Sequence, residues 1–134
     1  MMHNELEFHA FCLTDTGSRL DRFAAAIAAR VRPGDTVLDL GAGSGILSFL
    51  ACRAGARRVY AIEASGSIEF ARLLAERHGL QDRIEFIAQP STQVFLPERV
   101  GTVVGDIHDT FGLQRHGLTA LMDARDRFLA PGGA

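Results

Sequence analysis

The stretch VLDLGAGSGIL, residues 37–47, joins a short apolar run to three closely spaced glycines. An apolar run of this length, with a turn before it and glycines after it, predicts a buried parallel strand over residues 36–40. The glycines allow the backbone to turn tightly and to approach a ligand closely. A helix is expected to follow from about Ser44 to Ala54. The stretch therefore predicts a strand, a ligand-binding loop and a helix in succession.

Strands and helices alternate on both sides of this unit. Upstream, apolar residues at helical spacing predict a helix over residues 19–30. Downstream, the same patterns predict strands over residues 58–62, 84–87 and 102–104 and helices over about 66–78 and 118–129. This alternation predicts an α/β fold, a Rossmann-like doubly wound parallel sheet with flanking helices, which receives its ligand at the carboxyl ends of the strands.

The pattern divides the chain into an N-terminal helical cap, residues 1–35, and a Rossmann-like core, residues 36–134. Ala134 falls where such a sheet would start its next strand, so the core is expected to be partial, truncated after the fourth strand and its helix. The fourth strand would then form an uncovered edge, which favours aggregation unless something pairs with it. We therefore expect a fragment of a longer gene product, or a chain that completes itself with a partner.

Composition narrows the classes of function. The chain has 134 residues, is 47% hydrophobic and carries a net charge of -2, which is typical of one soluble globular domain. Its basic residues are scattered, so no nucleic-acid footprint is predicted. Cys12 and Cys52 lie far apart without metal-ligand spacing, which predicts no zinc site and no disulfide framework. With no apolar stretch near the ~18 residues that span a bilayer, we expect a cytoplasmic protein without membrane insertion.

The acid after the second strand refines the choice of ligand. Glu63 stands where an acid accepts hydrogen bonds from ribose hydroxyls, so the glycine loop and Glu63 together predict an adenosine-containing ligand. Ile46 is too large for the third small residue of the dinucleotide pattern. The Asp39 carboxylate would repel a pyrophosphate but could hold the ammonium group of a methionine. The loop therefore predicts S-adenosylmethionine, and a nicotinamide-dependent oxidoreductase is the alternative that it disfavours.

The stretch VLDLGAGSGILSFLACRAGARRVYAIEAS, residues 37–65, resembles the cofactor-binding segment of the protein arginine methyltransferases. A GxGxGILS loop, an AGA turn and an acid-ended second strand follow in the family's order. Downstream, LMDARDRFLAPGG, residues 121–133, is similar to the helix and turn after the family's catalytic loop. Upstream, the pattern of the helical cap that closes over the cofactor is matched, with one extra residue after Asp15, by His9, Leu13, Asp15, Arg19 and Phe23.

This resemblance implies the cofactor-binding half of a class I methyltransferase, which takes S-adenosylmethionine and leaves S-adenosylhomocysteine. It implies that Arg19 binds the methionine carboxylate and that Glu63 binds the ribose. Ser91 and Thr92 fall where the family contacts the adenine edge, although the family's acidic residue is missing there. The expected cofactor-binding residues are Arg19, Asp39, Gly41, Ala42, Gly43, Gly45, Ile46, Glu63, Ala64, Ser91 and Thr92. Family members pair through an arm in their second half and form the acceptor pocket with a β-barrel domain, and this sequence contains neither; a homo-oligomer is the partner that the resemblance implies.

The catalytic loop, VVGDIHDTFGLQRHG over residues 103–117, departs from the family's pattern. The family grips the substrate guanidinium with two glutamates, which suit a planar cation with paired donors. Here Asp106 stands in the first glutamate's place, and the second falls near Gln114 or Arg115. We therefore expect an altered acceptor loop that serves a nitrogen or oxygen of a small molecule or a protein side chain. Asp106 is the first candidate for orienting the acceptor or taking its proton, and His108 is the second.

Two further interpretations stay open. The missing second glutamate also fits a binding or regulatory module that keeps the cofactor fold without turnover, and such a module would bind the cofactor but transfer no methyl group. Asp106, His108 and Asp109 could be metal ligands, but three such side chains on one short loop are common without a metal. No metal site is therefore predicted.

Overall fold

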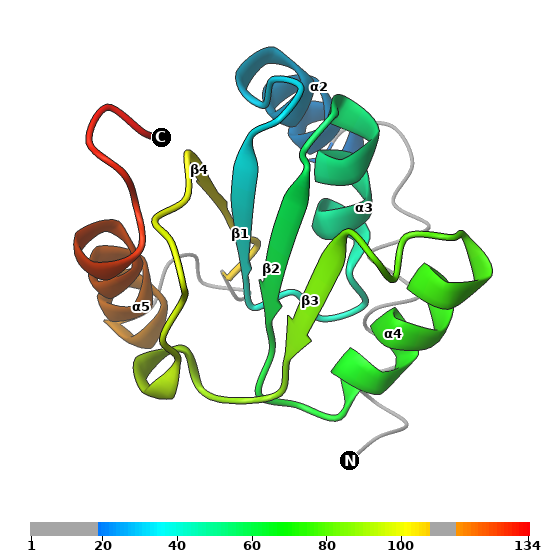
Figure 1. Cartoon of the computed structure of the whole chain (residues 1–134). Coiled ribbons are helices and arrows are strands. Elements are labelled where there is room, and N and C mark those ends of the chain that lie inside the picture. Colours follow the sequence, from blue (N-terminus) through cyan, green and yellow to red (C-terminus); the bar gives the residue numbers. More distant parts are fainter. Residues whose placement is uncertain (1–18, 108–114) are drawn as a thin grey trace.

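A computed structural model describes residues 19–107 and 115–134 of the chain. Its centre is a four-stranded parallel sheet with the strand order β3-β2-β1-β4 (Figure 1). The strands are β1 (Thr36–Leu40), β2 (Arg58–Ile62), β3 (Ile84–Ile87) and β4 (Thr102–Val104). The chain moves outward from β1 to β3 on one side and returns to β4 on the other. The strand order therefore reverses between β1 and β4, which is where such sheets receive ligands.

Helices cover both faces of the sheet. They are α2 (Arg19–Arg30), α3 (Ile46–Ala54), α4 (Ser67–Arg77) and α5 (Arg115–Arg127), with a short 3₁₀ turn η1 (Ser91–Gln93) between β3 and β4. In Figure 1, α3 and α4 lie on one side of the sheet and α5 lies on the other. Two buried clusters correspond to these two faces, one shared with α2 and α3 and one shared with α5.

Strand β1 contributes to both clusters because successive side chains of a strand point to opposite faces. Val37 packs in the cluster that includes Ile27 and Val31, and Leu38 packs in the cluster that includes Ala124. All five residues of β1 are buried. Burial on both faces explains why this strand is an unbroken apolar run, with Asp39 as its one charged residue.

The ends of two helices differ from the prediction. Helix α3 begins at Ile46 and not at Ser44, because Gly45 adopts the left-handed conformation with φ 84°. Helix α5 covers Arg115–Arg127, although residues 118–129 were expected. Its carboxyl end stops early because Leu129 forms a parallel bridge with Val100. The strand pairing therefore takes the last two residues that the periodicity assigned to the helix.

The outer edge of β4 is partly paired, contrary to the expectation of an uncovered edge. Val103 donates its backbone N–H to the carbonyl of Ala134 at 2.7 Å, and Ala134 donates to the carbonyl of Gly101 at 3.2 Å. The last residue of the sequence therefore lies alongside the edge strand.

No helix of the described ranges is long and apolar enough to cross a membrane.

Candidate functional site

The glycine loop lies where β1 and β2 end. Gly41 and Ala42 both donate their backbone N–H groups to the carbonyl of Ile62, the last residue of β2, each at 2.9 Å. Gly45 donates to the carbonyl of Ala42 at 2.8 Å and closes the turn into α3. The loop is thereby fixed to the neighbouring strand at the edge of the sheet where a ligand would enter.

All three glycines of the loop have a positive φ, and at two of them a side chain would also meet close neighbours. Gly41 has φ 70°, and a Cβ atom on it would lie 2.8 Å from Cγ2 of Ile107 in the segment after β4. Gly45 has φ 84°, and its Cβ atom would lie 3.1 Å from Cβ of Ala71 in α4 and 3.2 Å from Cζ of Phe49. These two positions therefore need glycine both for the backbone conformation and for close packing.

Glu63 follows β2 and contacts the glycine loop. One oxygen of its carboxylate accepts a hydrogen bond from the backbone N–H of Gly43 at 2.9 Å, and the other accepts one from the N–H of Ser65 at 2.8 Å. A carboxylate offers about four lone-pair positions, so these two backbone donors leave others available. Glu63 is half-buried and fixed in orientation. It can therefore accept hydrogen bonds from a pair of ligand hydroxyls beside the loop.

Asp39 lies beneath this loop and has no exposed surface. Its Oδ2 accepts a hydrogen bond from the hydroxyl of Ser48 in α3 at 2.7 Å, and its Oδ1 has no partner among the described residues. The pKa of Asp39 is raised to about 6, and burial is the main cause. The charges of Glu63 and Asp106 add to this increase, and the hydrogen bonds with Ser48 partly offset it. Because Asp39 has no exposed surface, its direct contact with a ligand's ammonium group is not seen in this structure and stays a prediction. The sequence analysis missed Ser48, which adds a hydroxyl to the base of the site.

A pocket lies between α2, the glycine loop and the segment after β4. Of the predicted site residues, it brings together Arg19, Gly41, Ala42, Gly43, Ile46 and Asp106. Three apolar residues that the sequence analysis did not assign, Leu20, Phe23 and Leu47, also line it. Phe23 and Leu47 belong to stretches that resemble the arginine methyltransferases, whereas Leu20 gave only the helical spacing of an apolar face, which looks the same whether the face lines a pocket or fills a core.

Arg19 and Asp106 form an ion pair across this pocket. The side chains are 29% and 24% exposed, so water reaches both. The sequence analysis gave the two residues separate roles, one toward the cofactor carboxylate and one toward the methyl acceptor. The structure places these two charges in contact with each other, so the two roles would be carried out at one place.

The other predicted residues of the described ranges do not line this pocket. Ala64 is exposed beside Glu63, and Ser91 and Thr92 lie on η1, which follows β3 at the same edge of the sheet. Several predicted residues belong to the ranges that the structure does not describe, namely His9, Leu13, Asp15, His108, Asp109 and Gln114. Within the described ranges, no three His, Cys, Asp or Glu residues gather as a group that could hold a metal ion.

The chain has a parallel sheet whose strand order reverses between β1 and β4, a glycine loop after β1 and an acid after β2. This combination is that of the class I methyltransferase fold. Residues 20–124 match the model of the ribosomal protein L11 methyltransferase (PrmA) family. The chain belongs to this methyltransferase family.

The curated relatives are arginine methyltransferases. The chain is 38% identical over 117 residues to protein arginine N-methyltransferase PRMT10 of Oryza sativa subsp. japonica, a match that covers 86% of this chain and 31% of that protein. It is 45% identical over 101 residues to the probable histone-arginine methyltransferase CARM1 of Oryza sativa subsp. indica, covering 75% of this chain and 19% of that protein. The chain therefore spans a third or less of the length of these relatives.

Solved structures agree. Arabidopsis thaliana protein arginine methyltransferase 10 superposes with a TM-score of 0.81 at 36% identity, over 86% of this chain and 34% of that one. The PRMT1 enzyme–prozyme heterotetrameric complex of Trypanosoma brucei with AdoHcy gives 0.80 at 29% identity, over 85% and 37%. The resemblance to the cofactor-binding half of the arginine methyltransferases is thereby confirmed.

Proposed function

We propose that the chain binds S-adenosylmethionine and transfers its methyl group to a nitrogen or oxygen acceptor, releasing S-adenosylhomocysteine. Membership of a methyltransferase family supports the type of reaction. The Trypanosoma brucei relative was crystallised with the demethylated cofactor, which supports the choice of cofactor.

The charge distribution around the glycine loop is the observation that carries this proposal. Asp39, Glu63 and Asp106 surround the loop with carboxyl groups, and among the described residues Arg19 is the cation that lines the pocket. S-adenosylmethionine carries a sulfonium, an ammonium and one carboxylate, which match three acids and one arginine. A pyrophosphate would meet the same acids with repulsion. The site therefore fits a cationic adenosyl cofactor better than a dinucleotide.

Each part of the cofactor has a counterpart in the chain. Glu63, fixed by the N–H groups of Gly43 and Ser65, would accept hydrogen bonds from the ribose hydroxyls. Arg19 would bind the carboxylate with its guanidinium group, whose forked donors suit a carboxylate. The apolar side chains of Leu20 and Phe23 in α2 would exclude water from the reacting centre.

Bound S-adenosylmethionine supplies an electrophilic methyl group, so the protein mainly has to align the acceptor. As the acceptor lone pair bonds to the methyl carbon, the carbon–sulfur bond breaks and the acceptor loses a proton. Asp106 would orient the acceptor and take that proton. His108 remains the second candidate for this proton.

A single acid at the acceptor position suggests the chemistry of the acceptor. By resemblance, the second glutamate of the arginine methyltransferases falls near Gln114 or Arg115, and Arg115 begins α5. We infer that one carboxylate, Asp106, suits a compact ammonium or a single nitrogen better than a planar guanidinium, which needs two. The matched family is named for ribosomal protein L11 and one relative for histone arginine, so a protein side chain is proposed ahead of a small molecule.

Calorimetry on the purified chain tests the cofactor. S-adenosylhomocysteine should bind and NAD should not, and Glu63→Gln should weaken binding about tenfold or more, because an amide replaces an acceptor with a donor. Glu76→Gln, on the exposed surface of α4, is the matched control and should change the Kd less than twofold. Binding of NAD in place of S-adenosylhomocysteine would favour the oxidoreductase alternative.

Transfer of a radiolabelled methyl group tests the reaction. Protein extracts and amine-containing small molecules serve as acceptors, and labelling that Asp106→Asn reduces at least a hundredfold would support the proposal. Tight cofactor binding with no labelling of any acceptor would favour the non-catalytic module instead.

A further inference from the structure

The turn η1 carries Ser91 and Thr92, which the resemblance to the arginine methyltransferases assigns to the adenine edge, yet little of the turn is buried. Thr92 and Gln93 are exposed and Ser91 is half-buried. Within the turn, Gln93 donates its N–H to the carbonyl of Pro90 at 2.9 Å and Val94 donates to that of Ser91 at 3.2 Å. Since a single 3₁₀ turn is weak by itself, contacts from elsewhere must fix its shape.

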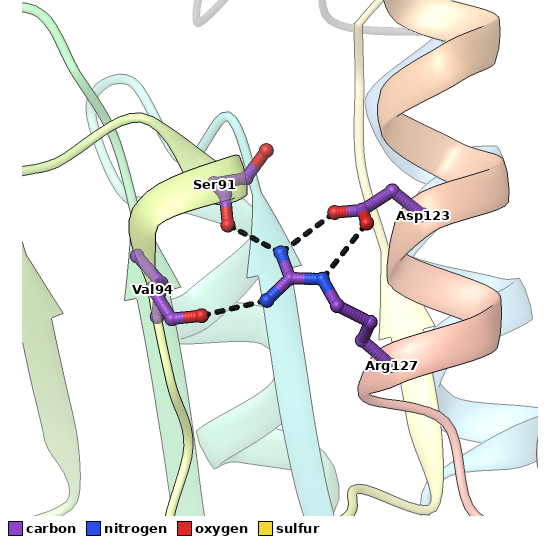
Figure 2. A network of polar contacts seen from close by, with 4 residues as sticks. All are labelled: Ser91, Val94, Asp123 and Arg127. Atoms are coloured by element: carbon purple, nitrogen blue, oxygen red, sulfur yellow. Dashed lines mark hydrogen bonds and ion pairs between the residues drawn. The ribbon is translucent and has the colours of Figure 1, made fainter.

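Arg127 of α5 supplies these contacts (Figure 2). Its two terminal nitrogens donate to the backbone carbonyl of Val94 at 2.8 Å and to that of Ser91 at 2.7 Å. The two carbonyls lie at the end and the start of the same turn. One guanidinium group therefore holds both sides of η1.

Asp123, one helical turn earlier on α5, holds the guanidinium in place. Its two carboxylate oxygens accept from Nε of Arg127 at 2.8 Å and from a terminal nitrogen at 2.7 Å. This hydrogen bonding to Arg127 lowers the pKa of Asp123, which keeps the carboxylate charged. The guanidinium also lies 4.3 Å from the ring centre of Phe128. A planar, forked donor with these partners has one orientation, which a lysine could not reproduce.

The docking of α5 onto the sheet has other anchors. Ala124 and Phe128 are buried in the cluster on that face, and Val100 donates its N–H to the carbonyl of Phe128 at 2.8 Å. Arg127 and Asp123 are about 30% exposed, with side-chain values of 30% and 28%. The pair therefore contacts the turn η1, while the buried side chains hold α5 on the sheet.

We propose that Asp123 and Arg127 are positioning residues that set the shape of η1 and thereby the recognition of the adenine base. This inference rests on the proposed function, because η1 would contact adenine only if the adenosyl cofactor binds at this edge of the sheet. The pair acts through the backbone of Ser91–Val94. Its loss should therefore affect the adenine end of the ligand more than the methionine end.

The test compares two ligands that differ only at the adenine edge. S-adenosylhomocysteine has an amino group on the base, and S-inosylhomocysteine has a carbonyl in its place. Calorimetry on the full chain gives the ratio of the two Kd values. We expect the wild type to favour the adenosyl ligand about tenfold or more, because a site built to bond an amino group rejects its replacement.

Arg127→Ala and Arg127→Lys should both reduce this ratio to within about threefold of unity, because neither side chain spans the two carbonyls and Asp123. Arg125→Ala is the matched control. Arg125 lies on the same helix in an exposed pair with Asp126, and its loss should leave the ratio unchanged within twofold. Arg127→Lys keeps the charge and remains informative if Arg127→Ala fails to fold.

Amide hydrogen exchange of the ligand-free chain supplies a second readout. The N–H groups of Gln93 and Val94 should exchange at least tenfold faster in Arg127→Lys than in the wild type or in Arg125→Ala. Unchanged exchange, a wild type that does not discriminate, or a variant that keeps the wild-type ratio would overturn the positioning role. A wild type that binds neither ligand would overturn the proposed function, and this inference with it.

Discussion

Asp39 shows that the site lowers the stability of the fold, because its carboxyl group is buried. It is a carboxyl group with no exposed surface at the end of a strand whose other four residues are uncharged, and one of its oxygens has no partner among the described residues. A hydrophobic residue there would complete the apolar run. The acid is tolerated because Ser48 donates to it and because a cationic ligand would stabilise its charged form.

The free energy of unfolding should reflect this burial. The pKa of Asp39 in the folded chain is about 6, compared with an ordinary value of 3.8, so between those pH values the folded state binds more protons than the unfolded state. Stability from this group is therefore lost as pH rises through the window. Asp39→Asn removes the effect, so its stability relative to wild type should rise by up to about 3 kcal/mol between pH 4 and pH 7. Urea denaturation across this range measures the difference.

Ser48→Ala supplies the companion variant. Loss of the hydroxyl hydrogen bond raises the pKa of Asp39 further, so the pH window should extend above pH 6. A stability difference between Asp39→Asn and wild type that is equal at pH 4 and pH 7 would contradict this account.

At the scale of residues, the sequence predicted the side chains that follow the strands. It did not predict the side chains that hold the site in position through hydrogen bonds. Glu63 and the glycines could be named because the ends of parallel strands meet at one edge. Ser48 and Arg127 could not, because a serine or an arginine on an amphipathic helix gives no sign of which carbonyl or carboxylate faces it. Arg127 contacts a turn more than thirty residues away, at Ser91.

At the scale of elements, buried periodic segments were predicted better than segments held by polar contacts. All four strands and α2 have the predicted bounds, because continuous apolar runs and helical spacing report burial directly. The turn η1 was not predicted, since its three polar residues have no apolar periodicity. The early end of α5 was also missed, because the bridge from Leu129 to Val100 is a tertiary contact.

The start of α3 makes a sharp prediction. Gly45 precedes this helix in the left-handed conformation, 3.1 Å from where its Cβ atom would meet Ala71. Gly45→Ala should lower the free energy of unfolding by about 1–2 kcal/mol and weaken cofactor binding, because the loop must shift. Urea denaturation and calorimetry measure the two effects.

Helix α4 provides the control for that variant. Gly66 precedes α4 with φ -66°, and a Cβ atom there would meet nothing within 4 Å. Gly66→Ala should leave the stability unchanged or raise it by about 0.5–1 kcal/mol, because alanine restricts the unfolded chain. If both alanines cost the same, the left-handed backbone of Gly45 would not be the cause.

For the whole molecule, the ion pair between Arg19 and Asp106 joins the first described helix to the segment after the last strand. The two residues are 87 positions apart, and the pocket lies between them. Two segments far apart in the sequence therefore line one pocket together with the glycine loop. Because Arg19 and Asp106 contact each other, a cofactor carboxylate bound by Arg19 would share the guanidinium with Asp106 or displace it.

Substitutions of the two partners of this ion pair, Arg19 and Asp106, should thus have different effects on cofactor binding. Arg19→Ala removes the partner of the cofactor carboxylate and should weaken S-adenosylhomocysteine binding about tenfold to a hundredfold, the loss expected for one charge-assisted hydrogen bond. Asp106→Asn removes the competing carboxylate, so the Kd should stay equal or fall severalfold, although methyl transfer is lost. Thermal denaturation with increasing S-adenosylhomocysteine reports both, because ligand at a hundred times the Kd stabilises the fold by about 2.7 kcal/mol. Equal weakening by both variants would mean that the pair acts only to hold α2 against the core, and that neither residue contacts the cofactor.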